Sequence, residues 1–182
     1  MTRLHVPAKE DADESVRPIL DKVEAQLGFL PNLHKVMSNS PAVLKGWLGL
    51  MSSLSTTLDV KTRDAIALAV SEVNACHYCL SAHSYVAATF ASVSSGEIAL
   101  NRQARSTDAK REAAARFAAT VIEQRGLIGD EAFESVRSAG YTDGQILEII
   151  ALAVQYSLTN IINNVAGTDI DFPLVEGPAR AA

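Results

Sequence analysis

The spacing of apolar residues constrains the fold of this chain more than any other feature. They recur every three or four residues, as on helices, and no run shows the sustained alternation of a strand. Capping residues mark helix starts: Ser40 before Pro41, Asp59, and Thr142 with Gln145 three residues later. Aromatic residues make up only 5% of the chain and Ala is frequent, which favours close-packed helices. The sequence predicts an all-α fold.

The length of 182 residues suits one domain. We predict an N-terminal tail over residues 1–12, a helical domain over 13–172 and a C-terminal tail over 173–182. Within the domain, one helix starts at Pro41, one runs from Asp59 toward the two cysteines, and a motif helix ends near Phe90. A short turn follows Ser94, and the other predicted helices cover 13–26, 32–38, 108–125, 130–138 and 143–163.

One internal echo suggests a pseudo-symmetric helix pair. The run D-A-I-A-L-A-V at 64–70 recurs as E-I-I-A-L-A-V at 148–154. Carrying that register forward pairs two asparagines with the two cysteines, Asn160 with Cys76 and Asn163 with Cys79. The second copy keeps the helix and lacks the thiol chemistry, although five shared residues of common types also arise by coincidence in helical chains.

The segment 72–83 reads E-V-N-A-C-H-Y-C-L-S-A-H and contains both cysteines of the protein. On a continuous helix, at about 100° per residue, the cysteines and His83 would lie within about 40° of Glu72. Thiol chemistry needs a thiolate, a proton acceptor near it and a second thiol to capture the oxidised sulfur. All three are present in this segment, which therefore predicts a redox site.

A helix break at Asn74-Ala75 decides which thiol is favoured. Asn tolerates the left-handed conformation that ends helices, and a break there puts Cys76 in the first turn of the next helix. The dipole at that end lowers a thiol pKa. His83 lies one turn after Cys79 and is better placed to deprotonate that thiol. We predict Cys79 as the attacking thiol and Cys76 as its resolving partner.

A C-x-x-C pair has three other interpretations. Haem attachment requires His directly after the second cysteine, where Leu80 stands, so it is excluded. Structural zinc usually draws two ligands from elsewhere in the chain, and no second Cys/His cluster exists. Buried structural cysteines are the third interpretation, because free cysteines are common in cores. The zinc interpretation would use four ligands: Glu72, Cys76, Cys79 and His83.

Cys76, Cys79 and His83 resemble the C-x-x-C-x-x-x-H motif of the alkyl hydroperoxidase D-like branch of the carboxymuconolactone decarboxylase family. Twelve residues before Cys76 that motif has Glu, and this chain has the shorter Asp64. Glu72, four residues before Cys76, resembles a subgroup described as peroxidase-related. Asp64 is explained equally well by the helix dipole, so we predict that Glu72 contributes more to a proton relay.

The resemblance covers roughly residues 20–172 and implies a single-domain, alkyl hydroperoxidase D-like helical bundle. It implies a thiol-dependent peroxidase or disulfide reductase that acts on organic hydroperoxides without a metal, haem or flavin cofactor. It further implies a homo-oligomer and a protein thiol or lipoylated carrier as reductant. Two alternatives stay open: a lyase like the family's decarboxylases, which needs no cysteine pair, and a zinc-binding or redox-sensing module.

Charge and hydropathy limit the classes of partner and the compartment that we expect for this protein. The net charge of −5 argues against nucleic acid, because phosphate binding needs a basic surface. The most apolar run, 146–154, is short and contains Glu148, so no membrane span is predicted. No secretory apolar region follows Met1, and two cysteines at this spacing do not staple a secreted domain. We predict a cytoplasmic protein whose apolar helix contacts another subunit.

Overall fold

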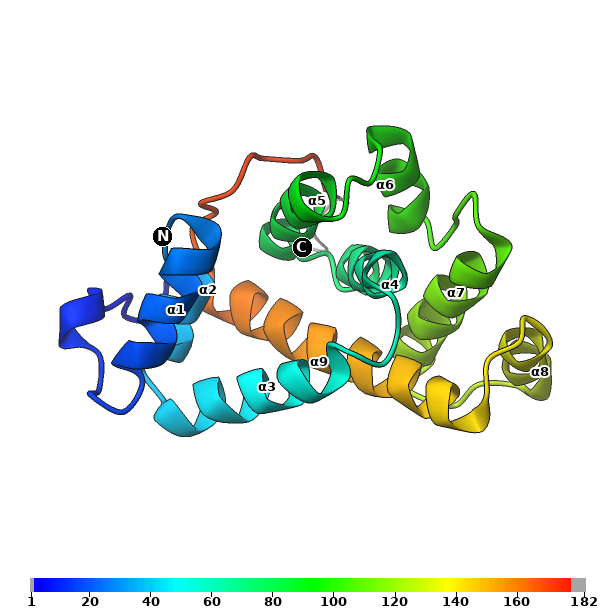
Figure 1. Ribbon diagram of the computed structural model, residues 1–182, viewed down its shortest axis with the longest axis horizontal. Coiled ribbons are helices and arrows are strands. Elements are labelled where there is room, and N and C mark those ends of the chain that lie inside the picture. The colour runs from blue at the N-terminus through cyan, green and yellow to red at the C-terminus, as the bar shows by residue number, and fades with distance from the viewer. Residues whose placement is uncertain (1, 178–182) are drawn as a thin grey trace.

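The computed structural model describes residues 2–177, and this part of the chain is helical without β-strands (Figure 1). A short 3-10 helix, Lys9–Asp11, precedes the α-helices. In chain order these are α1 Arg17–Leu27, α2 Asn32–Met37, α3 Pro41–Leu54, α4 Val60–Val73, α5 His77–Phe90, α6 Ser95–Arg102, α7 Ala109–Glu123, α8 Asp130–Ser138 and α9 Asp143–Ala166. The predicted all-α, single-domain fold is confirmed. Residues 1 and 178–182 of the predicted tails lie outside the described part.

The central element is α4, which Figure 1 shows almost end-on among α5, α6, α7 and α9. Every residue from Asp64 to Ser71 is buried. Ala65 and Ala69 pack against Ala115 and Ala119 of α7. Because these side chains end at Cβ, the two helices approach closely and exclude water from α4. The carboxyl group of Asp64, in the buried part of α4, is therefore enclosed by apolar neighbours.

The cysteine motif is split between two helices. α4 ends at Val73 and α5 begins at His77, and Ala75 between them has a φ of 47°, in the left-handed region. The predicted break is confirmed. The stripe expected on a continuous helix is wrong, because Glu72 lies on α4 and both cysteines lie beyond the break.

A polar clamp fixes this break against α9. The side chain of Asn74 donates through Nδ2 to Ser157 Oγ and to Asn160 Oδ1, each at 2.9 Å. Asn164 Nδ2 in turn donates to the carbonyl of Asn74 at 2.8 Å. Three residues of α9, Ser157, Asn160 and Asn164, thus hold this turn in place through contacts between segments that are distant in the sequence.

Most predicted helix ends are confirmed within one turn. Ser40 and Asp59 accept hydrogen bonds from backbone amides at the starts of α3 and α4, and Thr142 forms the expected capping box. The helix α6 is longer than the short turn expected after Ser94. The helix α9 also extends past its predicted end at 163, to Ala166.

The C-terminal segment 168–177 crosses α5 toward α6 (Figure 1). The ring of Phe172 packs against Tyr78 with centroids 5.7 Å apart. Further along, the amide of Val175 donates to Ser81 Oγ at 3.3 Å. The described residues of the predicted C-terminal tail are therefore attached to the helix that carries Cys79.

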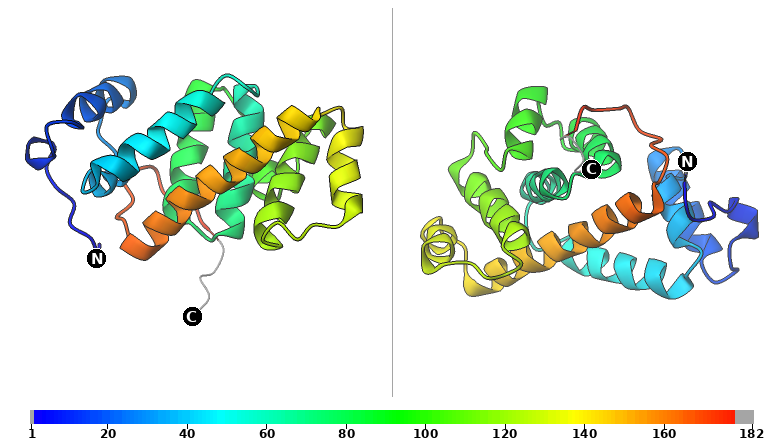
Figure 2. Two further views of the ribbon diagram at one scale, coloured as in Figure 1. Left: turned by 90° about the horizontal axis from the view of Figure 1, so that it is seen from below. Right: turned by 180° about the vertical axis from the view of Figure 1, so that it is seen from behind.

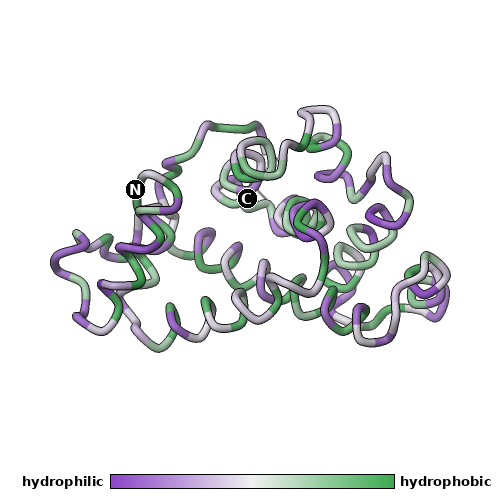
Figure 3. The backbone as a smooth tube through the Cα atoms, viewed as in Figure 1, coloured by the Kyte–Doolittle hydropathy of each residue, from purple (hydrophilic) through white to green (hydrophobic). Residues whose placement is uncertain are grey.

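The helix α9 lies beside α3 on one outer side of the molecule (Figure 2), and apolar residues recur along it (Figure 3). By length and composition it is the one described helix apolar enough to cross a membrane, although 44% of that window is buried within the chain. Its buried side includes Gln155 and Asn163. Its other side exposes five apolar side chains: Leu147, Val154, Leu158, Ile161 and Val165. An exposed apolar row of this kind is typical of a contact surface.

We expect this row to bury itself against a second copy of the chain. Light scattering coupled to gel filtration at micromolar concentration should give a mass above the 19.4 kDa of one chain. The substitutions Val154→Glu and Ile161→Glu should return the protein to the monomer mass, because a buried unpaired charge is costly. Leu127→Glu, at a side chain that is 85% exposed outside the row, is the control. A monomeric wild-type protein would contradict the expectation.

Candidate redox site

The two cysteines meet at the N-terminus of α5. Cys76 is the N-cap residue, one position before the helix, and its Sγ accepts a hydrogen bond from the Cys79 amide at 3.3 Å. The two sulfurs lie 2.6 Å apart, and both cysteines are buried and not joined by a disulfide. A disulfide has a sulfur–sulfur distance of about 2.05 Å, so oxidation requires little movement of either side chain. The first turn of α5 thus brings the two thiols together, as the C-x-x-C spacing predicts.

The environment of Cys79 favours its thiolate. Burial raises the pKa of this thiol, but hydrogen bonds from Cys76, Asn163, Asn160 and Thr159 together bring it below its ordinary value. The bond from Asn163 Nδ2 to Cys79 Sγ measures 3.3 Å. A lowered thiol pKa increases the fraction of the nucleophilic form at neutral pH.

His83 lies on α5, one turn beyond Cys79, and is partly buried. Burial lowers the pKa of its imidazole to about 4, so the ring is neutral at physiological pH and is able to accept a proton. Its ring packs edge-to-face on Tyr156, with centroids 5.2 Å apart. Within residues 2–177 His83 makes no hydrogen bond, and the expected contact with Cys79 rests on their helical spacing alone.

Asp64 is the buried carboxyl group of α4. Burial raises its pKa to about 6, an effect that Arg63 partly offsets, and its Oδ2 has no hydrogen-bond partner. Burial and the nearby charge of Asp64 both raise the pKa of the Tyr156 hydroxyl. Asp64 on α4 and His83 on α5 therefore face the same tyrosine on α9. The structure thus places an acid and a base, nineteen residues apart in the sequence, near the same tyrosine.

Glu72 is directed to another partner. Its Oε2 accepts a hydrogen bond from Arg102 Nε at 2.8 Å, and Arg102 also donates to the carbonyl of Glu176. The expected sharing of one helical stripe with the thiols is therefore not found. Among residues 2–177 no three His, Cys, Asp or Glu side chains are grouped so that they could hold a metal ion. The four-ligand zinc arrangement is not formed.

Sequence reasoning missed two contributors to the site, both on α9. Tyr156 carried no local signal, because nothing near it in sequence suggests an acid or a base. Asn163 did carry a signal, since the internal echo places it at the position of Cys79. The interpretation that the second copy merely lacks chemistry is corrected, because Asn163 contacts the sulfur of the first copy.

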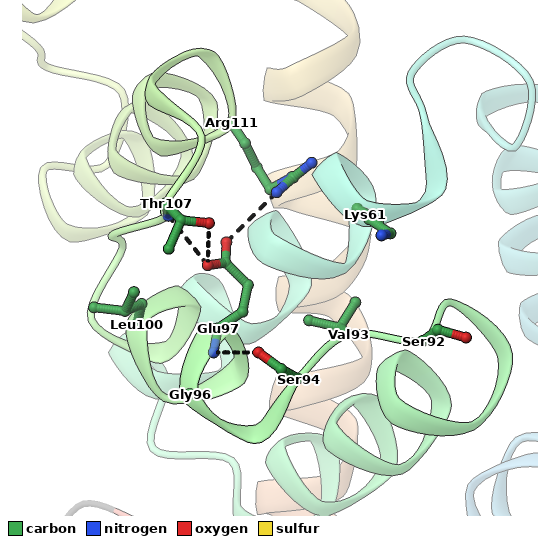
Figure 4. Close-up of a pocket in the computed structure, with 9 residues that line it drawn as sticks. All are labelled: Lys61, Ser92, Val93, Ser94, Gly96, Glu97, Leu100, Thr107 and Arg111. Carbon is green, nitrogen blue, oxygen red and sulfur yellow. Dashed lines mark hydrogen bonds and ion pairs between the residues drawn. The ribbon is translucent and has the colours of Figure 1, made fainter.

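A separate pocket lies between α4, α6 and α7, lined by Lys61, Glu97, Thr107 and Arg111 among others (Figure 4). Figure 4 shows the Glu97 carboxylate bonded to Thr107 and Arg111, so this acid fixes the start of α7. The residues that line the pocket include no cysteine or histidine. It is distinct from the thiol site.

Comparison with known proteins identifies the relatives of this site. Residues 41–121, from α3 into α7, match the carboxymuconolactone decarboxylase family. In structure the chain is similar to an uncharacterized peroxidase-related protein from Ralstonia eutropha JMP134, described as an alkylhydroperoxidase AhpD core, with a TM-score of 0.83 and 23% identity over 93% of this chain and 92% of that one. No curated protein matches the chain in sequence.

Two further solved structures have the same fold. A peroxidase-related protein from Silicibacter sp. TM1040 has a TM-score of 0.76 and 22% identity over 92% of this chain and 91% of that one. A cysteine-to-alanine variant of the debrominase Bmp8, solved with 2,3,4-tribromopyrrole, has a TM-score of 0.80 and 22% identity over 94% and 92% of the two chains. This chain has the alkylhydroperoxidase D-like fold. Its residues 41–121 match the model of the carboxymuconolactone decarboxylase family, which confirms the predicted resemblance.

The raised pKa of Asp64 has a consequence for stability. Its pKa rises from an ordinary 3.8 to about 6, so the native state keeps a proton that the unfolded chain loses between these values, and native stability falls as the pH rises through that window. We expect Asp64→Asn to be more stable than the wild type at pH 8, by about 1–3 kcal/mol. Below pH 3.8 this advantage should disappear, because both states then hold the proton.

Urea unfolding of both proteins at pH 8 and at pH 3.5 measures this difference. An equal difference at the two pH values would show that Asp64 is not protonated preferentially in the native state.

Proposed function

We propose that this protein is a thiol-dependent peroxidase that reduces organic hydroperoxides through Cys79 and Cys76. The observation that supports this most is the pair of buried sulfurs 2.6 Å apart, one of which has a lowered pKa. Buried structural cysteines give no reason for a thiolate-favouring environment, because burial alone raises a thiol pKa. A pair of this kind is suited to attack a peroxide and then to close a disulfide.

The first step is attack of the Cys79 thiolate on one oxygen of the hydroperoxide. A sulfur–oxygen bond forms, the O–O bond breaks, and the departing alkoxide takes a proton and leaves as an alcohol. Cys79 becomes a sulfenic acid, so the sulfur is oxidised by two electrons and the peroxide is reduced by two. His83, neutral at physiological pH, is suited to accept the thiol proton and return it to the alkoxide.

The second step is attack of Cys76 on the sulfenic sulfur of Cys79. The sulfur–sulfur bond forms and the sulfenic oxygen leaves as water, with one proton from the sulfenic hydroxyl itself and one from the Cys76 thiol. Each catalytic cycle therefore consumes two electrons, which an external dithiol restores by exchange at the disulfide. A protein thiol or a lipoylated carrier supplies that chemistry.

Asp64 is the acid that we assign to the proton relay, in place of the Glu72 favoured by the sequence. It is buried, lacks a partner at Oδ2 and faces the tyrosine against which His83 packs. A carboxyl group whose pKa is about 6 exchanges protons readily near neutral pH. Glu72 is held by Arg102 and is better explained as a structural ion pair.

The remaining properties follow from the same proposal. An organic rather than a strongly polar hydroperoxide suits thiols that lie within an apolar cluster containing Leu33, Leu44 and Trp47. A homo-oligomer is supported by the exposed apolar row on α9. A reducing compartment, the cytoplasm, keeps the pair in its dithiol form between cycles.

The lyase alternative has weaker support at this site. Decarboxylation of a lactone acid calls for an Arg or Lys that binds the substrate carboxylate, and Arg102, which contacts the motif residue Glu72, is already paired with it. The lyase also gives no role to the two adjacent sulfurs.

Stopped-flow mixing of the reduced protein with cumene hydroperoxide tests the activity directly. We expect one peroxide consumed for every two thiols lost, with the disulfide mapped by mass between the two cysteines. Cys79→Ser should abolish the reaction, whereas Cys76→Ser should stop after one turnover with a sulfenic acid that dimedone traps. Peroxide consumption that proceeds equally in both variants, or loss of no thiol in the wild type, would contradict the proposal.

The relay assignment predicts different effects of two matched substitutions. Asp64→Asn should lower the rate of peroxide reduction by roughly 100-fold, the usual scale of a lost general acid or base. Glu72→Gln should change that rate only a few-fold, because it removes an ion pair outside the proposed relay. Single-turnover rates with circular dichroism as the folding control measure both effects. A larger loss in Glu72→Gln would restore the assignment made from the sequence.

A further inference from the structure

Polar side chains of α9, a helix without cysteine, lie over the cysteine pair. Thr159, Asn160 and Asn163 lie there with exposures of 4%, 0% and 2%. Asn163 Nδ2 donates directly to Cys79 Sγ at 3.3 Å. Buried amides of this kind are costly unless their polar atoms are satisfied, so their position at the sulfur requires a physical reason.

The amides are placed by different means. Asn160 is held from two sides, because its Nδ2 donates to Ser71 Oγ at 3.2 Å and its Oδ1 accepts from Asn74. Asn163 has no such support: its Oδ1 is buried without a partner, and the bond to Cys79 is the one hydrogen bond of its side chain among residues 2–177. The Cys79 sulfur is therefore the acceptor for the Asn163 Nδ2 group.

Charged groups around Cys79 do not provide the same stabilisation. On α5, His83 is neutral at physiological pH, and burial raises the pKa of the Tyr78 hydroxyl so that it is neutral as well. On α9, Tyr156 is neutral for the same reason. α4 contributes two acids, Asp64 and Glu72, which oppose a thiolate rather than favour it. Its two cations lie in its first turn, where Lys61 is exposed and Arg63 donates to the carbonyl of Leu58, and neither bonds to Cys79 among residues 2–177. Neutral hydrogen-bond donors are what remains to favour the ionised sulfur.

We propose that Asn163, supported by Asn160 and Thr159, forms a neutral donor site that holds Cys79 as its thiolate. In other thiol sites a nearby cation stabilises the thiolate. Here the second copy of the internal repeat, on α9, would stabilise it with neutral hydrogen-bond donors. The lowered pKa of Cys79, to which bonds from these three residues contribute, agrees with this geometry. A role of this donor site in catalysis rests on the proposed peroxidase function. The stabilisation of the Cys79 thiolate by these donors does not depend on that function.

The test is the pH dependence of alkylation of Cys79 in the reduced full-length protein. Limiting iodoacetamide is added across a pH series, and the adduct on each cysteine is measured by mass. Asn163→Ala should raise the midpoint pH for Cys79 by about one to two units, the scale of a lost hydrogen bond to a charged group. Below that midpoint its alkylation should slow by at least about tenfold.

Asn164→Ala is the matched control. This neighbouring asparagine lies on the same helix and donates to the carbonyl of Asn74 and not to the sulfur, so its loss loosens the turn without removing a donor and should shift the Cys79 midpoint far less than Asn163→Ala does. If Asn163→Ala does not fold, Asn163→Asp keeps the size of the side chain, and its carboxylate should raise the midpoint further. A folded Asn163 variant with the wild-type midpoint would overturn the proposal, as would an equal shift in Asn164→Ala.

This readout separates the two proposals. A shifted midpoint in a protein that does not consume peroxide would refute the peroxidase function and support the donor site. Peroxide consumption with an unshifted midpoint would refute the donor site alone.

Discussion

The site depends on the turn between α4 and α5 and on the clamp that holds it. Ala75 adopts a left-handed conformation that is unfavourable for a residue with a Cβ, and the backbone bonds that close the end of α4, from Ala75 to Glu72 and from Cys76 to Ser71, offset part of this cost. The Asn74 side chain bonds to α9 from this turn, and Asn164 bonds back to its carbonyl. With the turn fixed, Cys76 becomes the N-cap of α5 and its sulfur reaches that of Cys79. The clamp also fixes the position of α9 relative to this turn, and therefore the position from which Asn163 contacts the Cys79 sulfur.

Close helix packing gives the second condition. Alanines on facing sides of α4 and α7 leave no room for water around the middle of α4. Asp64 is enclosed there without a hydrogen-bond partner for Oδ2, and its pKa rises as a result. The fold thus maintains a carboxyl group in a destabilising environment. This group lowers the stability of the native state at neutral pH, because an apolar residue would pack there at lower cost.

The repeat in the sequence has a structural meaning that the repeat alone does not reveal. Both copies form helices, and the first copy supplies Cys79 while the second supplies Asn163. The two positions that the register aligns are in contact across the pseudo-symmetric pair. One copy thus provides a cysteine sulfur and the other provides a hydrogen-bond donor to that sulfur.

The sequence by itself determined the helices, the break at Asn74-Ala75 and the closeness of the two thiols, because capping, glycine stops and a three-residue spacing act within a single turn of chain. It did not determine which acid faces the site. The break rotates α5 away from the direction of α4, so the helical angle of Glu72 no longer predicts its neighbours, and Arg102 binds it instead. Asp64, Tyr156 and Asn163 gain their roles only when α4, α5 and α9 pack together, since burial and contacts between distant segments set their pKa values and partners.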